Sequence, residues 1–79
     1  MEQQHTPEPL AIDTDDIRLD NLLKWAGITT TGGETRILID ERRIKRNGEL
    51  ETARRRKCVP GDIIEIEGIG TYQVTREAE

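Results

Sequence analysis

The side chains most able to do chemistry lie in one stretch, RRIKRNGELETARRRK, which runs from residue 42 to residue 57. Half of its residues are Arg or Lys, and its only acids are Glu49 and Glu51. Guanidinium groups donate paired hydrogen bonds to phosphate oxygens, and bound cations release the counterions of a polyphosphate chain. A merely solvated face, usually mixed in sign, is the alternative interpretation. The density of one sign favours a nucleic-acid-binding surface.

Residues for catalysis are not grouped in the sequence. His5 is the one histidine, and it falls in the acidic N-terminal segment, far along the chain from Cys58, the one cysteine. A single cysteine excludes an intramolecular disulfide and the usual Cys and His spacing of a zinc site. Acids occur in adjacent pairs such as Asp15-Asp16, which is typical of a solvated surface. We therefore expect a protein that is not an enzyme and has no cofactor.

Charge is distributed unevenly along the 79 residues, although the formal net charge is only -4. Residues 1–16 carry -5, residues 17–58 carry +5, and residues 59–79 carry -4. We expect a flexible acidic tail at 1–14, a single RNA-binding domain at 15–76, and a short C-terminal tail at 77–79. No signal sequence or apolar run long enough for a membrane span is visible, so we expect a soluble, cytoplasmic monomer without membrane contact.

A first helix is predicted from Leu19 to Ala26, because apolar residues recur there at intervals of three and four. Gly27 follows directly, as a helix-ending glycine does. Trp25 lies about 110° from the centre of the apolar stripe, by the period of 3.6 residues. Two interpretations of this side chain stay open, which are packing at the edge of the core and stacking on an unpaired base.

A second helix is predicted from about residue 31 to residue 42 or 43. Thr31 and Glu34 have the spacing of a capping box, in which the Thr hydroxyl accepts the amide N–H of Glu34. In the same motif the Glu carboxylate accepts the amide N–H of Thr31. We expect Ile37 and Leu38 to face inwards.

Short strands are predicted after the second helix. Asn47-Gly48 indicates a two-residue hairpin turn, which folds the basic stretch back on itself. Pro60-Gly61 marks another turn, followed by an alternating strand at 62–67 and a last strand around 72–74. This order predicts an α+β fold in which two N-terminal helices pack on a small antiparallel β-sheet.

The hairpin turn brings the two ends of the basic stretch together, so we expect one continuous positive patch. Near the start of the second helix, hydroxyl groups and free N–H groups also suit a phosphate, although a cap alone explains these residues. The candidate phosphate contacts are Thr29 and Thr30, and the candidate RNA-binding residues are Lys24, Arg36, Arg43, Lys45, Arg46, Arg54, Arg55, Arg56 and Lys57.

The segment IRLDNLLKWAGITTTGGETRILIDERRIKRNGELETARRRKCVPGDIIEI, residues 17–66, resembles a known family. It is similar to the RNA-binding domain named after ribosomal protein S-four, also called the αL motif, in its short stand-alone bacterial form. The resemblance implies that structured RNA, often ribosomal or transfer RNA, lies across the helical pair and the adjoining strand residues. Where members of the family often have Ala, Gly and Val, this chain has Thr35, Arg42 and Arg46.

The leading hypothesis is a non-enzymatic protein that binds structured RNA and associates with a ribosome or another ribonucleoprotein. A second hypothesis is a protein-interaction module whose basic face docks on an acidic partner or a ribosome-associated factor. A DNA-binding helix-turn-helix is less favoured, because the link between residues 27 and 33 is longer than the about 3 to 4 residues usual for that motif.

Overall fold

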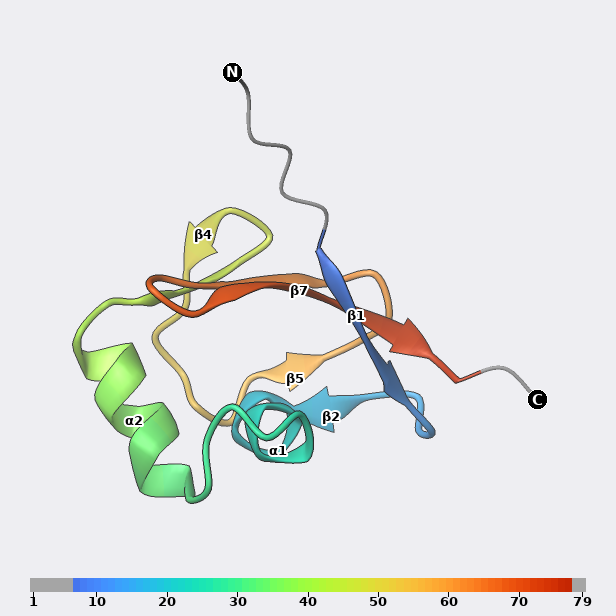
Figure 1. Cartoon of the computed structure of the whole chain (residues 1–79), viewed down its shortest axis with the longest axis horizontal. Coiled ribbons are helices and arrows are strands. Elements are labelled where there is room, and N and C mark those ends of the chain that lie inside the picture. The colour runs from blue at the N-terminus through green and yellow to red at the C-terminus, as the bar shows by residue number, and fades with distance from the viewer. Residues whose placement is uncertain (1–6, 78–79) are drawn as a thin grey trace.

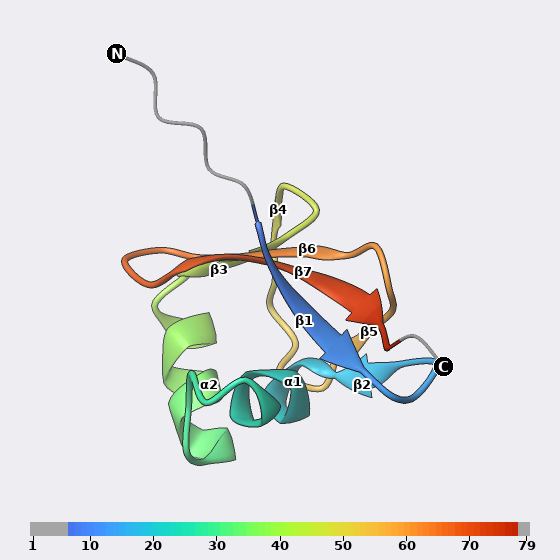
Figure 2. The same cartoon turned by 45° about the vertical axis from the view of Figure 1, so that its right-hand side comes forward.

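The computed structural model describes residues 7–77, in which seven strands and two helices are found. Five strands form one sheet in the order β1-β7-β6-β3-β4, and β2 pairs with β5 in a second, two-stranded sheet. Both helices lie on one side of the larger sheet (Figure 1, Figure 2). In chain order the elements are β1 (Glu8–Ile12), β2 (Ile17–Arg18), α1 (Leu19–Trp25), α2 (Gly32–Asp40), β3 (Ile44–Arg46), β4 (Glu49–Leu50), β5 (Lys57–Cys58), β6 (Ile63–Ile66) and β7 (Gly70–Arg76).

The predicted fold, two N-terminal helices on an antiparallel sheet, is wrong. Two strands precede the helices, and β1 runs parallel to β7, so the sheet is mixed. In β1, Leu10 packs against the core and Ile12 is buried within it. Pro9 is compatible with this strand because β1 lies at the edge of the sheet, where a missing N–H is tolerated.

The predicted acidic tail at 1–14 therefore includes β1 at residues 8–12. The rest of that prediction for residues 1–6, with His5, lies outside the described residues, as do residues 78–79 of the predicted C-terminal tail. No helix among residues 7–77 is long and apolar enough to cross a membrane.

Helix α1 ends as its sequence predicts. Gly27 takes a φ of +78°, and its N–H donates to the carbonyl of Lys24 at 3.0 Å. The N–H of Ile28 donates to the carbonyl of Leu23 at 2.9 Å. These two bonds satisfy the last carbonyls of the helix in the pattern of a Schellman motif.

Helix α2 begins with the predicted cap, but one half of the capping box differs. The hydroxyl of Thr31 accepts the N–H of Glu34 at 3.3 Å, as expected. The Glu34 carboxylate instead accepts the N–H of Thr30 at 2.7 Å, one residue before the predicted donor. The carboxylate thus extends past the cap residue and lies over the N-terminus of the helix.

Helix α2 ends two to three residues before its predicted end, because Arg42 takes a φ of 59°. Arg42 donates its N–H to the carbonyl of Ile39 at 2.9 Å, and Arg43 donates to Leu38 at 3.0 Å. This is again a Schellman motif, in which the left-handed position is usually glycine. An arginine at this position makes the turn at a steric cost.

The buried stripe of α2 also differs from the prediction, because Ile37 is 56% exposed whereas Ile39 is buried. The stripe consists of Thr35, Leu38 and Ile39, which follow the helical spacing of three and four residues. Its first member is a polar residue that is fully buried. A prediction that counts only apolar residues misses Thr35, and it therefore places the inward face at Ile37 and Leu38 in place of Leu38 and Ile39.

The hairpin at Asn47 and Gly48 forms as predicted. Both residues have a positive φ, 54° and 85°, which a two-residue turn of this type requires. The turn joins β3 to β4, with Arg46 opposite Glu49.

The core lies between the helices and the larger sheet, and consists mainly of Ile and Leu, as the composition requires. Alternate residues of β3 and β6 point into it, because successive side chains of a strand face opposite sides. Cys58 is fully buried, in the manner of a small apolar side chain. The members are Ile12, Leu19, Leu22, Leu23, Leu38, Ile39, Ile44, Cys58, Ile64, Ile66 and Val74.

Candidate nucleic-acid interface

The segment Arg54–Lys57, which we call the basic loop, is fixed to the start of α1 through its backbone. Leu19 donates its N–H to the carbonyl of Arg56 at 2.8 Å, and Asp20 donates to the carbonyl of Arg54 at 3.0 Å. The first N–H groups of a helix have no acceptor within the helix. In α1, the side chain of the N-cap residue Arg18 accepts none of them. The basic loop therefore serves as the cap of α1 and has a defined position.

A buried carboxylate holds the same loop from within. Glu51 is 3% exposed and accepts the N–H groups of Thr52 and Ala53 at 3.0 and 2.9 Å. Its other oxygen accepts Nε–H of both Arg46 and Arg56 at 3.1 Å. Burial raises the pKa of the Glu51 carboxyl, but the Ala53 amide and the two guanidinium groups together hold it below its ordinary value. Arg46 and Arg56 are therefore structural partners of Glu51.

The ion network continues to the turn before β6. Nη1 of Arg46 lies 3.7 Å from Oδ2 of Asp62, which is itself buried. Asp62 also accepts the N–H of Val59 at 3.0 Å and Nδ2–H of Asn47 at 3.0 Å. The hairpin, the basic loop and the start of β6 are thus joined by one set of polar contacts.

A second buried carboxylate, that of Asp20, lies in the first turn of α1. Asp20 is 4% exposed, and its Oδ2 lies 2.6 Å from Nη2 of Arg18. The hydrogen bond from Arg18 lowers the pKa of the Asp20 carboxyl, and the charge of Arg54 acts in the same direction. A Cβ on Gly32 would lie 3.8 Å from Nη1 of Arg54. The Arg54 side chain therefore lies beside the starts of both helices.

Half of the bases of the chain carry no ion pair within the described residues. Arg36 is a further exposed base, whose one carboxylate contact, to Asp40, is long at 3.9 Å. We define the basic edge as Arg36 together with the basic loop. The bases with no carboxylate within 4.0 Å among residues 7–77 are Lys24, Arg42, Lys45, Arg54, Arg55 and Lys57.

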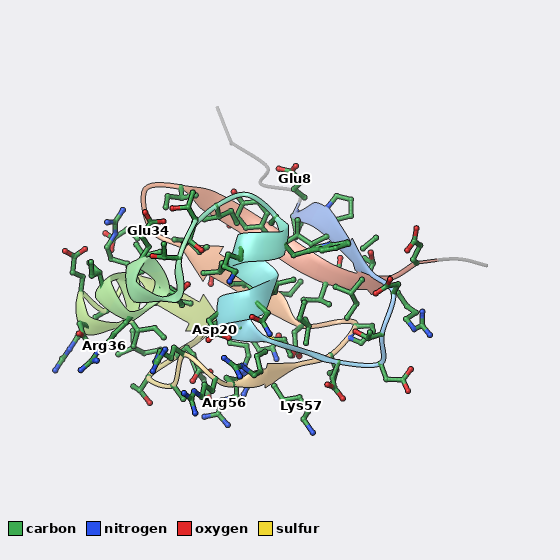
Figure 3. All side chains as sticks on the ribbon, turned by 90° about the horizontal axis from the view of Figure 1, so that it is seen from below. Glu8, Asp20, Glu34, Arg36, Arg56 and Lys57 are labelled. Atoms are coloured by element: carbon green, nitrogen blue, oxygen red, sulfur yellow. The ribbon has the colours of Figure 1, made fainter. Side chains whose placement is uncertain are left out.

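Among residues 7–77, one exposed acid pairs with the basic edge, namely Asp40, whose carboxylate lies 3.9 Å from Arg36. Figure 3 shows Arg36, Arg56 and Lys57 directed outwards along the lower side of that view, whereas Glu8 and Glu34 lie toward its upper side. Separation of this kind concentrates positive potential on one side of a molecule whose total charge is negative. The edge can therefore attract a polyanion despite the acidic pI.

The structure divides the predicted patch into two groups. Arg42, Arg43 and Lys45 line a shallow depression of about 620 Å³, together with the acids Glu65 and Glu67. The Arg43 guanidinium donates to the Glu67 carbonyl at 2.8 Å, and Lys45 lies opposite Glu65 in the strand register. Because strand side chains alternate, Lys45 points away from the helices, to the other face of the sheet. This second group is mixed in sign.

The remaining candidates lie apart from the basic edge. Thr29 is buried, and Oγ1–H of Thr30 donates to the Glu34 carboxylate at 3.2 Å. The Glu34 carboxylate thus occupies the position from which a phosphate would approach the N-terminus of α2. We therefore assign no phosphate contact to Thr29 or Thr30. Lys24 is exposed on the last turn of α1.

Sequence reasoning missed the two acids that position this surface. In the sequence, Glu51 is simply one of two acids within the basic stretch. It lies midway between Arg46 and Arg56, five residues from each, and binds both. Asp20 follows Arg18 by two residues at the start of a helix. The two spacings differ, and the one signal that the sequence offers is an acid within five residues of an arginine.

Two comparisons bear on most of the chain. A family model described as "S4 domain" matches residues 10–75, which extend from within β1 to within β7. A Bacillus subtilis (strain 168) protein with the name "Probable ribosome maturation protein RlbA" is 39% identical to this chain over 66 residues. The aligned part covers 84% of this chain and 93% of that protein.

Proposed function

The chain belongs to the S4 domain family, and from this membership we propose that it is a non-enzymatic protein that binds structured RNA. The resemblance identified in the sequence is confirmed over residues 10–75. The name of the Bacillus relative favours ribosomal RNA over transfer RNA, and hence a ribosome-associated role in the cytoplasm. A single copy carries the whole basic edge, so a monomer suffices.

The observation that carries this proposal is the fixed position of unpaired arginines on the basic loop. Arg54, Arg55 and Lys57 have no carboxylate partner among residues 7–77, while the backbone beneath them is bound to α1 and to Glu51. A loop held in this way loses little conformational entropy when it binds phosphates. Paired donors on Arg suit phosphate oxygens better than the point charge of Lys.

The proposed contacts follow the geometry. Primary phosphate contacts are assigned to Arg36, Arg54, Arg55 and Lys57, on the helical side of the molecule. Contacts of this kind read the shape and phosphate positions of a folded RNA rather than a long base sequence. Arg46 and Arg56 act mainly by holding the loop, since both are bonded to Glu51. Lys24, Arg43 and Lys45 are assigned secondary contacts.

Binding of a folded ribosomal RNA fragment at low salt tests the proposal. We expect Arg55→Glu to weaken binding by roughly tenfold or more, because one contact is lost and a repulsion is added. Arg76→Glu is the matched control, since it makes the same change of charge on β7, away from the basic edge. No affinity for any folded RNA, or equal affinity of both variants, contradicts the proposal.

One observation favours a second function, docking on a protein partner through an apolar surface. Ile37 and Ile69 are 56% and 45% exposed and line an apolar depression of about 250 Å³ with Ile28 and Leu38. Exposed apolar surface of this kind occurs at protein interfaces. Purification from cell extract separates the two functions. An RNA partner is removed by nuclease, whereas a protein partner stays bound after nuclease treatment.

A further inference from the structure

A third depression, of about 350 Å³, lies beside α1. One wall is helical, because Asn21 and Trp25 are four residues apart and so share a face of α1. The other wall comes from the connection between β1 and β2, which contributes Asp13 and Asp16. In Figure 3 the ribbon of α1 faces the viewer, and this connection runs beside it.

Trp25 is held in an exposed orientation at this depression. The side chain is 60% exposed, and its indole Nε1–H donates to the backbone carbonyl of Ala11 in β1 at 3.0 Å. Most Trp side chains are largely buried. An exposed Trp side chain usually loses its rotamer freedom only when a ligand binds to it. Here the hydrogen bond to β1 already fixes the ring. A flat, fixed aromatic surface can stack on a nucleobase at a small entropic cost.

Arg18 also lines the depression, but its guanidinium is paired with Asp20, and the other polar groups match the edge of a base rather than a phosphate. Asp13 and Asp16 bring carboxylates, which only accept hydrogen bonds and which repel a phosphate. Asn21 brings both a donor and an acceptor. A base that presents N–H donors on its Watson–Crick edge, such as guanine, would be bound by these groups.

The depression adjoins the basic edge at Arg18. Arg18 lines the depression, and it is the neighbour of Lys57 of the basic loop in the register of β2 and β5. An RNA whose phosphates lie on Lys57 therefore passes beside the depression. Sequence-specific recognition of RNA usually relies on bases that are unpaired and stacked on aromatic side chains.

We propose that this depression binds one unpaired nucleobase, guanine in preference, which stacks on Trp25 beside the phosphates held by the basic loop. The inference deepens the proposed RNA-binding function and rests on it. It adds one base-specific contact to a surface that otherwise reads shape.

The chain has one Trp, so its fluorescence reports on this site alone. The first RNA probe is a short hairpin with a single unpaired guanosine beside the stem, and the second is the same hairpin with that base paired. We expect both to bind, and only the first to quench Trp25. Binding of both without quenching overturns this inference and leaves the proposed function standing. Failure of both to bind overturns the two together.

Variants separate stacking from folding. Trp25→Ala should weaken binding of the unpaired-base hairpin by between about 5-fold and about 150-fold and leave the paired hairpin unchanged. Trp25→Phe keeps a ring without the bond to Ala11 and should give an intermediate loss. Leu50→Ala is the control, since its side chain is 42% exposed on β4, outside the depression and the basic edge. Equal effects of Trp25→Ala on both hairpins overturn the inference, provided that thermal melts show a folded variant.

Asp16→Asn tests the preference for guanine. This variant lacks one carboxylate. The difference in its affinity for a hairpin with an unpaired guanosine and one with an unpaired uridine should therefore be smaller than that of the unmodified protein. An unchanged preference for guanine contradicts the assigned role of this wall.

Discussion

Arg56 donates Nε–H to the carboxylate of Glu51 at 3.1 Å, from the middle of the basic loop to an acid that is 3% exposed. Arg46 donates to the same oxygen from β3. The bond therefore ties the proposed RNA-binding loop to the sheet. An acid thus fixes the position of the basic loop.

Loss of this anchor should cost stability. Glu51→Ala leaves two guanidinium groups and two backbone N–H groups without their acceptor. We expect the free energy of unfolding in urea to fall by about 2 to 3 kcal/mol, below the ~3 to 5 kcal/mol of a fully buried pair, because both arginines are partly exposed. A loss under about 0.5 kcal/mol, the usual size of surface effects, would show that the anchor has no structural weight.

Glu51→Gln distinguishes position from charge. This variant gains one unit of positive charge, so attraction to RNA by charge alone predicts tighter binding. We expect weaker binding, since the two arginines lose a charged partner and the loop loses its fixed position. Affinity for folded RNA at constant salt is the measurement. Tighter binding than the unmodified protein would show that net charge decides affinity.

Acid should destabilise the fold through Glu51 and Asp20. The pKa of each carboxyl is lowered in the folded state, from ordinary values of 4.5 and 3.8. Such a group contributes stability that is present above the unfolded pKa and is lost as pH falls through the folded pKa. We expect urea unfolding to show this loss below about pH 4.5. Glu51→Gln should make the decline shallower, and an unchanged decline would assign it to other carboxyls.

Arg42 is expected to be replaceable by glycine with a gain in stability. A left-handed conformation costs a residue other than glycine about 1 to 2 kcal/mol, and glycine loses about 0.5 to 1 kcal/mol more backbone entropy on folding. Arg42→Gly should therefore add about 0.5 to 1 kcal/mol and raise the Tm by about 2 to 8 °C. A lower Tm would show that the arginine side chain stabilises the turn.

Asn47 is the matched comparison, because it too has a positive φ. Its side chain, unlike that of Arg42, donates to Asp62 and accepts the N–H of Ile63. Asn47→Gly should lower stability by about 1 kcal/mol, since the two lost hydrogen bonds outweigh the relief of the backbone. Thermal melts of both variants should shift in opposite directions.

Cys58 should be unreactive in the folded protein. Burial raises the pKa of its thiol to about 12, so the reactive thiolate is nearly absent at neutral pH. We expect a thiol reagent to label Cys58 only as fast as the protein unfolds, and labelling in urea to be rapid. Fast labelling without denaturant would contradict the buried position of Cys58.

Local signals account for the parts of the fold that the sequence predicts. Gly27, Thr31 and the Asn47-Gly48 pair each fix the backbone of their own neighbours, and all three act as expected. Strand β1 was not predicted because its apolar residues, Leu10 and Ile12, are few and stand among acids. Its partner β7 lies at the other end of the chain, so the pairing that makes it a strand is not local.

The candidate site was predictable in composition but not in arrangement. Counting charges locates the basic stretch, whereas the pairing of Arg46 and Arg56 with Glu51 depends on how strands and loop meet. The expected single patch assumed that the hairpin turn alone brings the arginines together. Alternation along β3 instead places Lys45 on the face away from the basic loop.

The salt dependence of RNA affinity tests the central claim, that the basic loop binds phosphates, most directly. The logarithm of the association constant should fall linearly with the logarithm of salt concentration, by about 0.7 to 0.9 for each phosphate neutralised. Arg54→Ala with Arg55→Ala should reduce that slope by roughly 1.5, whereas Arg42→Ala with Arg76→Ala, which removes the same charge elsewhere, should leave it nearly unchanged. Equal slopes for the two double variants would contradict the account.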